Sequence, residues 1–235
     1  MMVLVGGTAS AQDGTPAAAI PLFAPDALVE GLDLAAWSAR AWQWSFSLPV
    51  SINPYQDSTG AWCGYGQSGP VFFLSGAEES VERSCAIPEG VALFVPLVQS
   101  GCSTVEEPPF FGRDEADLRR CAAAAIDAAE GALDMDAMAV TVDGRRFDEL
   151  AAYRASTPQF ALWLPAENEL GSDRPVADAA ADGYQVMLRP LAAGEHEVVL
   201  DVPGPGPGQF ATVTYHLSVV SGAYAPPAGT PPASS

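Results

Sequence analysis

Residues 196–219 have the sequence HEVVLDVPGPGPGQFATVTYHLSV. Two runs of apolar or alternating residues flank a segment of glycine and proline, which is the pattern of two strands joined by a turn. Because successive side chains of a strand point to opposite faces, each run has one apolar face. The members of these faces are Val198, Leu200 and Val202, and then Ala211, Val213, Tyr215, Leu217 and Val219. We therefore predict an antiparallel hairpin that covers a core.

Further strands are predicted at 71–74, 81–87, 91–98, 139–142, 159–164 and 184–188. The runs 71–74 and 91–98 are almost continuously apolar, which is typical of strands covered on both faces. In 81–87 the pattern alternates, and Arg83 falls on the same face as Cys85 and Ile87. The 22 glycines and 21 prolines supply many turns. This composition favours short strands over a long-helix architecture.

Two helices are predicted beside these strands. The first follows Asp33, a good N-cap, and ends near Leu48 because Pro49 stops it. The second runs from Asp114 to about Glu130, with Gly131 as its C-terminal stop. Each has a stripe at helical spacing that is suited to packing on a sheet. The stripes consist of Leu34, Trp37, Ala41, Trp44 and Leu48, and of Leu118, Cys121, Ala122, Ala125 and Ala129.

The fold class that these patterns predict is mainly β, with β-sandwich-like antiparallel sheets and two packed α-helices. We expect a single domain over 26–221. Residues 1–25 are interpreted as a signal-peptide remnant and linker, and residues 222–235 as a disordered tail rich in proline. A length of 235 residues with 49% hydrophobic content is sufficient for a sizeable core.

The charge and the basic residues exclude several functions. The formal net charge is −19, which repels nucleic acid, so we expect no nucleic-acid partner. All ten basic residues are arginine, and the absence of lysine excludes Schiff-base chemistry and a P-loop. No segment after the leader has about 18 consecutive apolar residues, so no transmembrane span is predicted. No cofactor motif is present, and we expect no cofactor.

The N-terminus predicts export. Residues 1–8 are mainly apolar and lead to Ala9-Ser10-Ala11, a pattern of the kind that signal peptidase cleaves. The basic n-region is missing, so a disordered N-terminal tail is the alternative. Export places the mature chain outside the cytoplasm, as a secreted, periplasmic or cell-surface protein.

Four cysteines occur, at Cys63, Cys85, Cys102 and Cys121. They lack C-x-x-C spacing, which disfavours a zinc site or a redox pair. An even number of cysteines in an exported chain favours disulfides. We predict the pairs Cys63–Cys85 and Cys102–Cys121, because each closes a short loop between adjacent elements. Four buried thiols are the alternative.

Several motifs resemble those of a family of exported, β-rich bacterial proteins without an assigned activity. The resemblance covers most of residues 33–220. Its motifs are the segments Asn53-Pro54 to Thr59-Gly60 with Cys63, Gly66–Gly76, Cys85–Gly90, Asp182-Gly183-Tyr184, and Gly194–His196 to Thr214–His216. The resemblance implies export and a β-rich domain. Glycine, proline and aromatic patterns specify turns and packing, so it implies no functional residues.

Two candidate sites come from the residues themselves. The aromatic residues Tyr55, Trp62 and Tyr65 lie in a loop with nearby amides and carboxylates, a combination suited to stacking on sugar rings. The alternative is a loop that is held to the domain by its own aromatic residues. In the hairpin, strand parity places His216 opposite Glu195 or Glu197, and such a group is able to bind a metal or act as an acid/base pair.

The alternative for His216 is a solvated cross-strand pair. His196 falls on the opposite face and is interpreted as a core-edge residue. We expect a non-catalytic extracytoplasmic binding or surface module, with a carbohydrate or cell-surface ligand as its partner. The first alternative is a secreted hydrolase that uses carboxylates or a metal near His216, and the second is a structural envelope protein. Both a binding protein and an enzyme are therefore compatible with the sequence.

Overall fold

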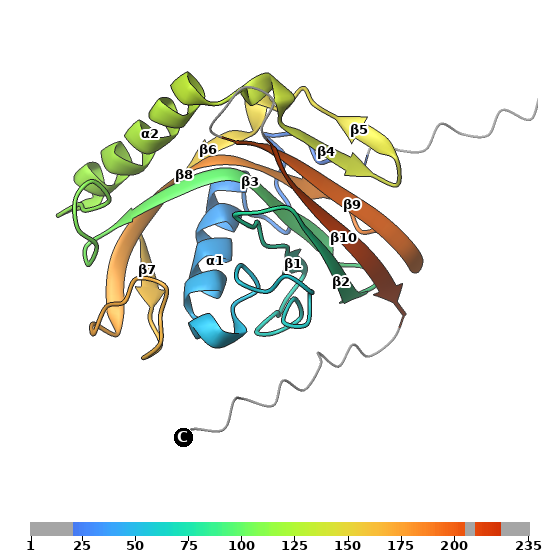
Figure 1. Ribbon diagram of the computed structural model, residues 1–235, viewed down its shortest axis with the longest axis horizontal. Helices are drawn as coiled ribbons and strands as arrows, with labels where there is room; N and C mark the ends of the chain where they lie inside the picture. Colours follow the sequence, from blue (N-terminus) through green and yellow to red (C-terminus); the bar gives the residue numbers. More distant parts are fainter. Residues whose placement is uncertain (1–20, 205–209, 222–235) are drawn as a thin grey trace, which may run out of the picture.

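The computed structural model describes residues 21–204 and 210–221 (Figure 1). Its helices are α1 (Leu34–Phe46) and α2 (Glu115–Ala132), with 3-10 turns at Val50–Ile52, Met135–Ala137 and Ala151–Tyr153. Its strands are β1 (Val71–Phe73), β2 (Val81–Pro88), β3 (Ala92–Ser103), β4 (Ala139–Val142), β5 (Arg145–Phe147), β6 (Arg154–Ser156), β7 (Phe160–Trp163), β8 (Val176–Leu188), β9 (Gly194–Pro203) and β10 (Phe210–Val220). The predicted leader, the tail and residues 205–209 of the hairpin turn lie outside the described residues.

The strands form two five-stranded sheets, so the predicted mainly β fold with two helices is confirmed. The first sheet has the order β1-β3-β8-β6, with β7 also paired to β8. The second has the order β2-β10-β9-β4-β5. Most pairs are antiparallel, but β1 pairs with β3 and β2 pairs with β10 in parallel. The sheets are therefore mixed, whereas the sequence predicted antiparallel sheets without these two parallel pairs.

The main core lies between the two sheets. The predicted hairpin of β9 and β10 is antiparallel, with Leu200 opposite Val213 and Val198 opposite Tyr215. The apolar face of the hairpin meets side chains of the first sheet, as strand parity predicts. The buried members of this contact include Leu93, Val95, Val186, Leu188, Val198, Leu200, Val213, Tyr215 and Leu217.

The two helices cover different faces of the first sheet. The stripe of α1, including Trp37 and Trp44, packs against Val71, Phe73 and Phe94 on the face that is turned away from the second sheet. In Figure 1 the long strands β3 and β8 curve over α1, and α2 lies outside the curve. Each helix begins at the predicted N-cap, because the carboxylate of Asp33 or Asp114 accepts from a backbone N–H of the first turn.

The C-terminal stop of α2 was predicted wrongly. Gly131 lies within the helix, which continues to Ala132 and ends at the cap residue Leu133. The inward stripe of α2 is confirmed for Leu118 and Ala122, which are fully buried. None of the helices in the described ranges is long and apolar enough to cross a lipid bilayer.

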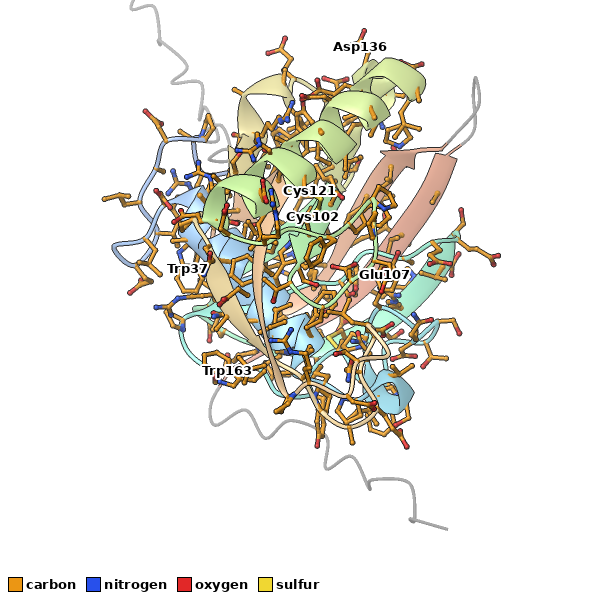
Figure 2. The ribbon with its side chains drawn as sticks, turned by 90° about the vertical axis from the view of Figure 1, so that its left-hand side faces the viewer. Trp37, Cys102, Glu107, Cys121, Asp136 and Trp163 are labelled. Carbon is orange, nitrogen blue, oxygen red and sulfur yellow. A yellow bond between two sulfur atoms is a disulfide. The ribbon has the colours of Figure 1, made fainter. Side chains whose placement is uncertain are left out.

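Both predicted disulfides are present. Cys63 is bonded to Cys85, and Cys102 is bonded to Cys121, with sequence separations of 22 and 19 residues. Figure 2 shows the second bond joining α2 to β3. The first bond joins the loop after α1 to β2. In the loop-entropy model, closures of this length stabilise the fold by roughly 3 kcal/mol each.

The chain joins the domain earlier than the boundary at residue 26 implies. Leu22 is buried and forms a bridge with Leu188, and the backbone N–H of Phe23 donates to Met187. Two short strands, β5 and β6, were not predicted. Three residues are too few for a periodic pattern to be recognised.

Candidate functional site

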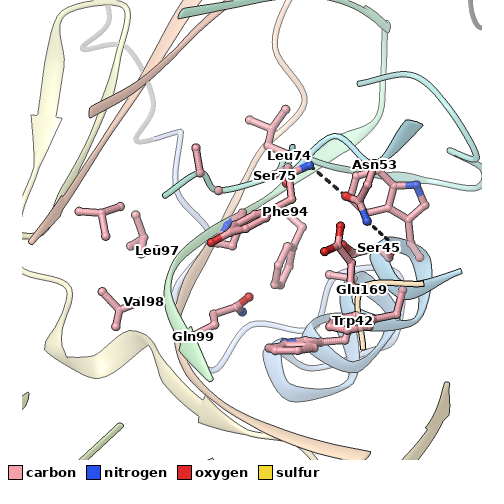
Figure 3. Close-up of a pocket in the computed structure, with 18 of the residues that line it drawn as sticks. Trp42, Ser45, Asn53, Leu74, Ser75, Phe94, Leu97, Val98, Gln99 and Glu169 are labelled. Atoms are coloured by element: carbon pink, nitrogen blue, oxygen red, sulfur yellow. Dashed lines mark hydrogen bonds between the residues drawn. The ribbon is translucent and has the colours of Figure 1, made fainter. Parts of the chain in front are cut away.

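A pocket of about 400 Å³ opens beside α1 (Figure 3). It is bounded by the C-terminal half of α1, the segment 74–77 that follows β1, the middle of β3, and the loop that contains Glu169. Val202 and Pro203 at the end of β9 complete its rim. The volume falls within the range of small-molecule sites, which is roughly 300–1,000 Å³.

The lining is mostly apolar and aromatic. The rings of Trp42 and Phe46 stack with centroids 5.2 Å apart, and both line the pocket together with Phe94. Gly101 lets the indole of Trp42 lie against β3, because a Cβ at this glycine would be 2.8 Å from the ring. The position of Trp42 is therefore set by the backbone of the sheet.

The polar residue Asn53 is held rigidly at one side of the pocket. Its Nδ2 donates to the carbonyl of Ser45 at 3.0 Å, and its Oδ1 accepts from the backbone N–H of Tyr55 at 2.9 Å. Only 1% of Asn53 is exposed. These contacts tie the loop 53–55 to the end of α1 (Figure 3).

Two polar atoms of the pocket residues have no hydrogen-bond partner in the described structure. They are Nε1 of Trp42, a donor, and Oε1 of Glu169, an acceptor, and both atoms are buried. The other oxygen of Glu169 accepts a long hydrogen bond of 3.4 Å from Gln56. Buried polar atoms without partners are rare, so each of them needs an explanation.

The surroundings of Glu169 disfavour its charge. Burial raises the pKa of the Glu169 carboxyl, the hydrogen bond from Gln56 opposes this shift, and the nearby charge of Glu78 adds to it. Burial also raises the pKa of the Tyr55 phenol, and Glu78 and Glu169 add to that shift. The mouth of the pocket is therefore a region of negative potential.

At the inner end of the pocket, Gln99 meets a second buried amide. The Nε2 atom of Gln99 donates to Oε1 of Gln185 at 2.6 Å. The Nε2 atom of Gln185 is buried and has no partner among the described residues. This third unpaired atom belongs to a residue that does not line the pocket.

Arg83 holds two of the pocket walls in place. This arginine is 1% exposed, and its guanidinium donates to the backbone carbonyls of Ser75 and Gly76 on one segment. It also donates to the carbonyls of Tyr55 and Asp57 on the other. The hydroxyl of Tyr215 accepts from it at 2.8 Å. The inward direction of Arg83 agrees with the alternation seen in the sequence.

The three predicted aromatic residues do not all line this pocket. Tyr55 does, and it is 37% exposed. Trp62 and Tyr65 pack edge to face at 6.2 Å within one turn, and neither is among the pocket-lining residues. The carbonyl of Tyr65 accepts from Nε1 of Trp44, and the backbone N–H of Trp62 donates to Asp57. The contacts of Trp62 and Tyr65 are thus within the loop and with α1, as in the alternative in which the aromatic residues hold the loop to the domain.

The predicted metal group is spread over the second sheet. His216 lies opposite Glu197, as strand parity predicts, but the closest atoms of this pair are 3.9 Å apart. Glu82 is 3.8 Å from His216, and Glu195 instead accepts from Ser218. Within 21–204 and 210–221, no group of three or more potential ligands is arranged to hold a metal ion.

His196 lies on the other side of the hairpin, as predicted. Its Nδ1 is 2.8 Å from Asp143, and its Nε2 is 2.9 Å from the carbonyl of Ala192. Burial lowers the pKa of His196, but these two contacts outweigh it and raise the pKa overall. The role of His196 is to brace the turn between β4 and β5.

The residues that sequence reasoning missed are Trp42, Asn53 as an anchor, and Glu169. Trp42 does not belong to the predicted stripe of the first helix, and this is the signal in the sequence that its neighbours differ from those of Trp37 and Trp44. Nothing in the sequence near Glu169 distinguishes it from the other acidic residues. These residues meet only because the loop 165–170 folds back against the 3-10 turn after α1, where the backbone N–H of Val50 donates to the carbonyl of Glu167.

Comparisons with known proteins add little. No protein-family model and no curated protein matches the chain. Among solved structures, the solution structure of amebosin is similar at 10% sequence identity and a TM-score of 0.20. That match covers 62% of this chain and 100% of the other. A TM-score this low carries no argument about fold or function, so function is inferred from the pocket itself.

Proposed function

We propose that the chain is a non-catalytic extracytoplasmic binding module that holds a small polar ligand, such as a carbohydrate, in the pocket beside α1. The observation that carries this proposal is that two residues lining one pocket, Trp42 and Glu169, each have a buried polar atom without a partner. A bound molecule with one acceptor and one donor would satisfy both. The desolvation penalty of an unpaired buried polar group is about 1–3 kcal/mol, which such a ligand would relieve.

The form of the lining supports a carbohydrate-like ligand. Aromatic faces and a small number of fixed polar groups are typical of sites that bind sugars. Tyr55, Trp42 and Phe46 supply the rings, and Asn53, Gln99 and Glu169 supply polar atoms. Two disulfides in one chain favour an oxidising compartment and support the extracytoplasmic assignment.

Hydrolysis is less well supported than binding. Glycoside hydrolases use two carboxyl groups that flank the bond, whereas Glu169 is the one carboxylate among the described residues that line the pocket. Both histidines lie in the second sheet. The hydrolase alternative therefore requires either an additional carboxyl group or the His216 surface, and metal analysis tests the latter. A stoichiometric ion that is lost in His216→Ala would favour it.

The test of binding uses a panel of neutral and amino monosaccharides and disaccharides, followed by NMR chemical shifts. We expect shifts at pocket residues for at least one sugar. Trp42→Phe keeps the ring but removes the Nε1 donor, so it should weaken that binding by about tenfold. Trp62→Phe is the matched control, since this aromatic residue lies outside the pocket, and it should leave affinity unchanged.

Two results would contradict the proposal. In one, no member of the panel shifts any resonance of the pocket. In the other, Trp62→Phe weakens binding and Trp42→Phe does not, which would move the site to the turn that contains Trp62 and Tyr65.

A further inference from the structure

Glu169 is a carboxylate without a cationic partner. It forms no ion pair with any described residue, and its one hydrogen bond is the long contact from the neutral amide of Gln56. Arg83, which influences the nearby phenol of Tyr55, directs its donors to backbone carbonyls and to Tyr215. The charge of Glu169 is thus not neutralised within the described protein.

The field around the pocket favours a positive ligand. The chain carries a net charge of −19, and Glu78 adds a second negative charge close to Glu169. An anionic group in this pocket would meet like charge at short range in a partly desolvated site, which is unfavourable. A cationic group would be attracted both by Glu169 and by the overall field.

The rings of the pocket also favour a cation. Trp42 and Phe46 are stacked, and Tyr55 lines the same pocket. Aromatic faces attract ammonium groups, with tryptophan the strongest of the three ring types. Figure 3 shows the carboxylate of Glu169 between Asn53 and the indole of Trp42 in that view.

The donor of Trp42 distinguishes an organic cation from a metal ion. An indole N–H repels a bare cation but donates to an oxygen acceptor. A metal ion would also need several oxygen, nitrogen or sulfur ligands, and Glu169 supplies the single carboxylate of the described lining. The pocket therefore needs a molecule that carries both an N–H cation and an acceptor oxygen.

We propose that the ligand is an organic ammonium ion with a neighbouring hydroxyl or carbonyl oxygen. Its ammonium group pairs with the carboxylate of Glu169, and its oxygen accepts from Nε1 of Trp42. Because the unpaired atoms are buried in the unliganded protein, binding turns the two side chains toward the ligand. This inference rests on the proposed binding function and narrows it to one class of ligand. An amino sugar or another amino alcohol has this arrangement, whereas a neutral sugar lacks the charge.

The test compares two probes of nearly the same shape, trans-2-aminocyclohexanol and trans-cyclohexane-1,2-diol. An aliphatic amine is protonated at neutral pH, since its pKa is about 10. Calorimetry at neutral pH should find the amine bound about tenfold more tightly than the diol, because a charge-assisted hydrogen bond replaces a neutral one. Glu169→Gln should remove this preference while the diol still binds.

The control is Glu167→Gln, which removes an equal charge from the same loop without altering the lining, and it should keep the preference. The preference should also fall as the pH falls through the raised pKa of Glu169, since protonation removes its charge. If the diol binds as tightly as the amine, the ammonium inference fails while the binding function stands. If neither probe binds and the sugar panel also gives no shifts, the binding function itself is overturned.

Discussion

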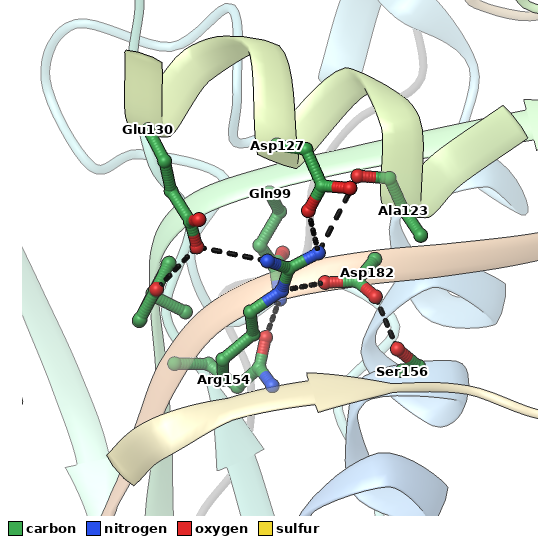
Figure 4. A network of polar contacts seen from close by, with 9 residues as sticks. Gln99, Ala123, Asp127, Glu130, Arg154, Ser156 and Asp182 are labelled. Atoms are coloured by element: carbon green, nitrogen blue, oxygen red, sulfur yellow. Dashed lines mark hydrogen bonds and ion pairs between the residues drawn. The ribbon is translucent and has the colours of Figure 1, made fainter. Parts of the chain in front are cut away.

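Two polar clusters lie on opposite faces of the first sheet, and they differ in how completely they are paired. Beneath α2, Arg154 donates through Nε to Asp182 at 2.7 Å, and its other nitrogens form ion pairs with Asp127 and Glu130 at 2.8 Å (Figure 4). Asp182 also accepts from the hydroxyl of Ser156. Beneath α1, the pocket leaves Trp42 and Glu169 each with an unpaired atom.

The comparison shows how to separate structural polar groups from binding groups. The cluster of Arg154 satisfies its charges internally, and its contact with Asp182 raises the pKa of Arg154. Such a cluster joins α2 to β6 and β8 and has no need of a ligand. The pocket lacks that internal pairing, and both residues with an unpaired atom line its cavity. It is the incomplete pairing that indicates function.

The largest expected effect is that of breaking the paired cluster. Arg154→Met should lower the free energy of unfolding by about 3–5 kcal/mol, because Asp182, whose side chain is 1% exposed, would keep a buried charge without its cation. Urea denaturation measures this loss. Adding Asp182→Asn to Arg154→Met should recover part of it. A loss no larger than that of Arg119→Met, a surface ion-pair variant, would show that the cluster is not structural.

A smaller effect is expected at Arg83, which is paired but lies next to the pocket. Arg83→Met should lower the free energy of unfolding by about 3 kcal/mol, because the carbonyls of Tyr55, Asp57 and Gly76 would lose the guanidinium as their donor. The carbonyl of Ser75 would keep the hydroxyl of Tyr215. Because Arg83 also positions the loop that contains Tyr55, this variant should weaken ligand binding under conditions in which it is still folded. NMR titration measures the binding. Unchanged affinity in the folded variant would contradict this positioning role.

The smallest effect is expected at the unpaired carboxylate. Glu169→Gln should raise the free energy of unfolding at neutral pH by less than about 1 kcal/mol, since the carboxylate is partly solvated. The folded pKa is raised above the ordinary value of 4.5, so the native state prefers the protonated carboxyl. In the wild type, the contribution of Glu169 to the free energy of unfolding is therefore fully present below pH 4.5. It is lost as the pH rises through the pKa of the folded state.

The variant should lack this pH-dependent loss, and thermal unfolding at a series of pH values compares the two proteins. A Glu169→Gln protein that is clearly less stable than the wild type at neutral pH would mean that Glu169 is paired, and the contrast between the two clusters would disappear.

The sequence predicted the parts of the fold that depend on local pattern. The two faces of the hairpin, both N-caps and the inward face of β2 follow from periodicity and residue type within one element. Both disulfides followed from spacing. The parallel pairing of β2 with β10 was missed because these strands lie far apart in the sequence. That of β1 with β3 was missed although the two strands are close in the sequence, because β2, which lies between them, belongs to the other sheet.

The pocket could not be predicted for the same reason. Trp42, Asn53, Gln99 and Glu169 come from four segments, and only the closed fold brings them to one cavity. The sequence candidates were selected by proximity along the chain, which favours residues such as Trp62 and Tyr65 that share a turn. Tyr55 belongs to both sets because its loop reaches the pocket.

The parallel pairing of β2 with β10 also determines when the domain can be completed. Among the described strands, β2 lies at the edge of the second sheet and pairs with β10 alone, which comes last in sequence order. In a polypeptide that is synthesised or exported from its N-terminus, β2 stays unpaired until residues 213–220 have also emerged. Contacts between such distant segments close slowly. Until then the backbone edge of β2 has no strand partner, and an unpaired strand edge makes an incompletely folded chain prone to aggregation.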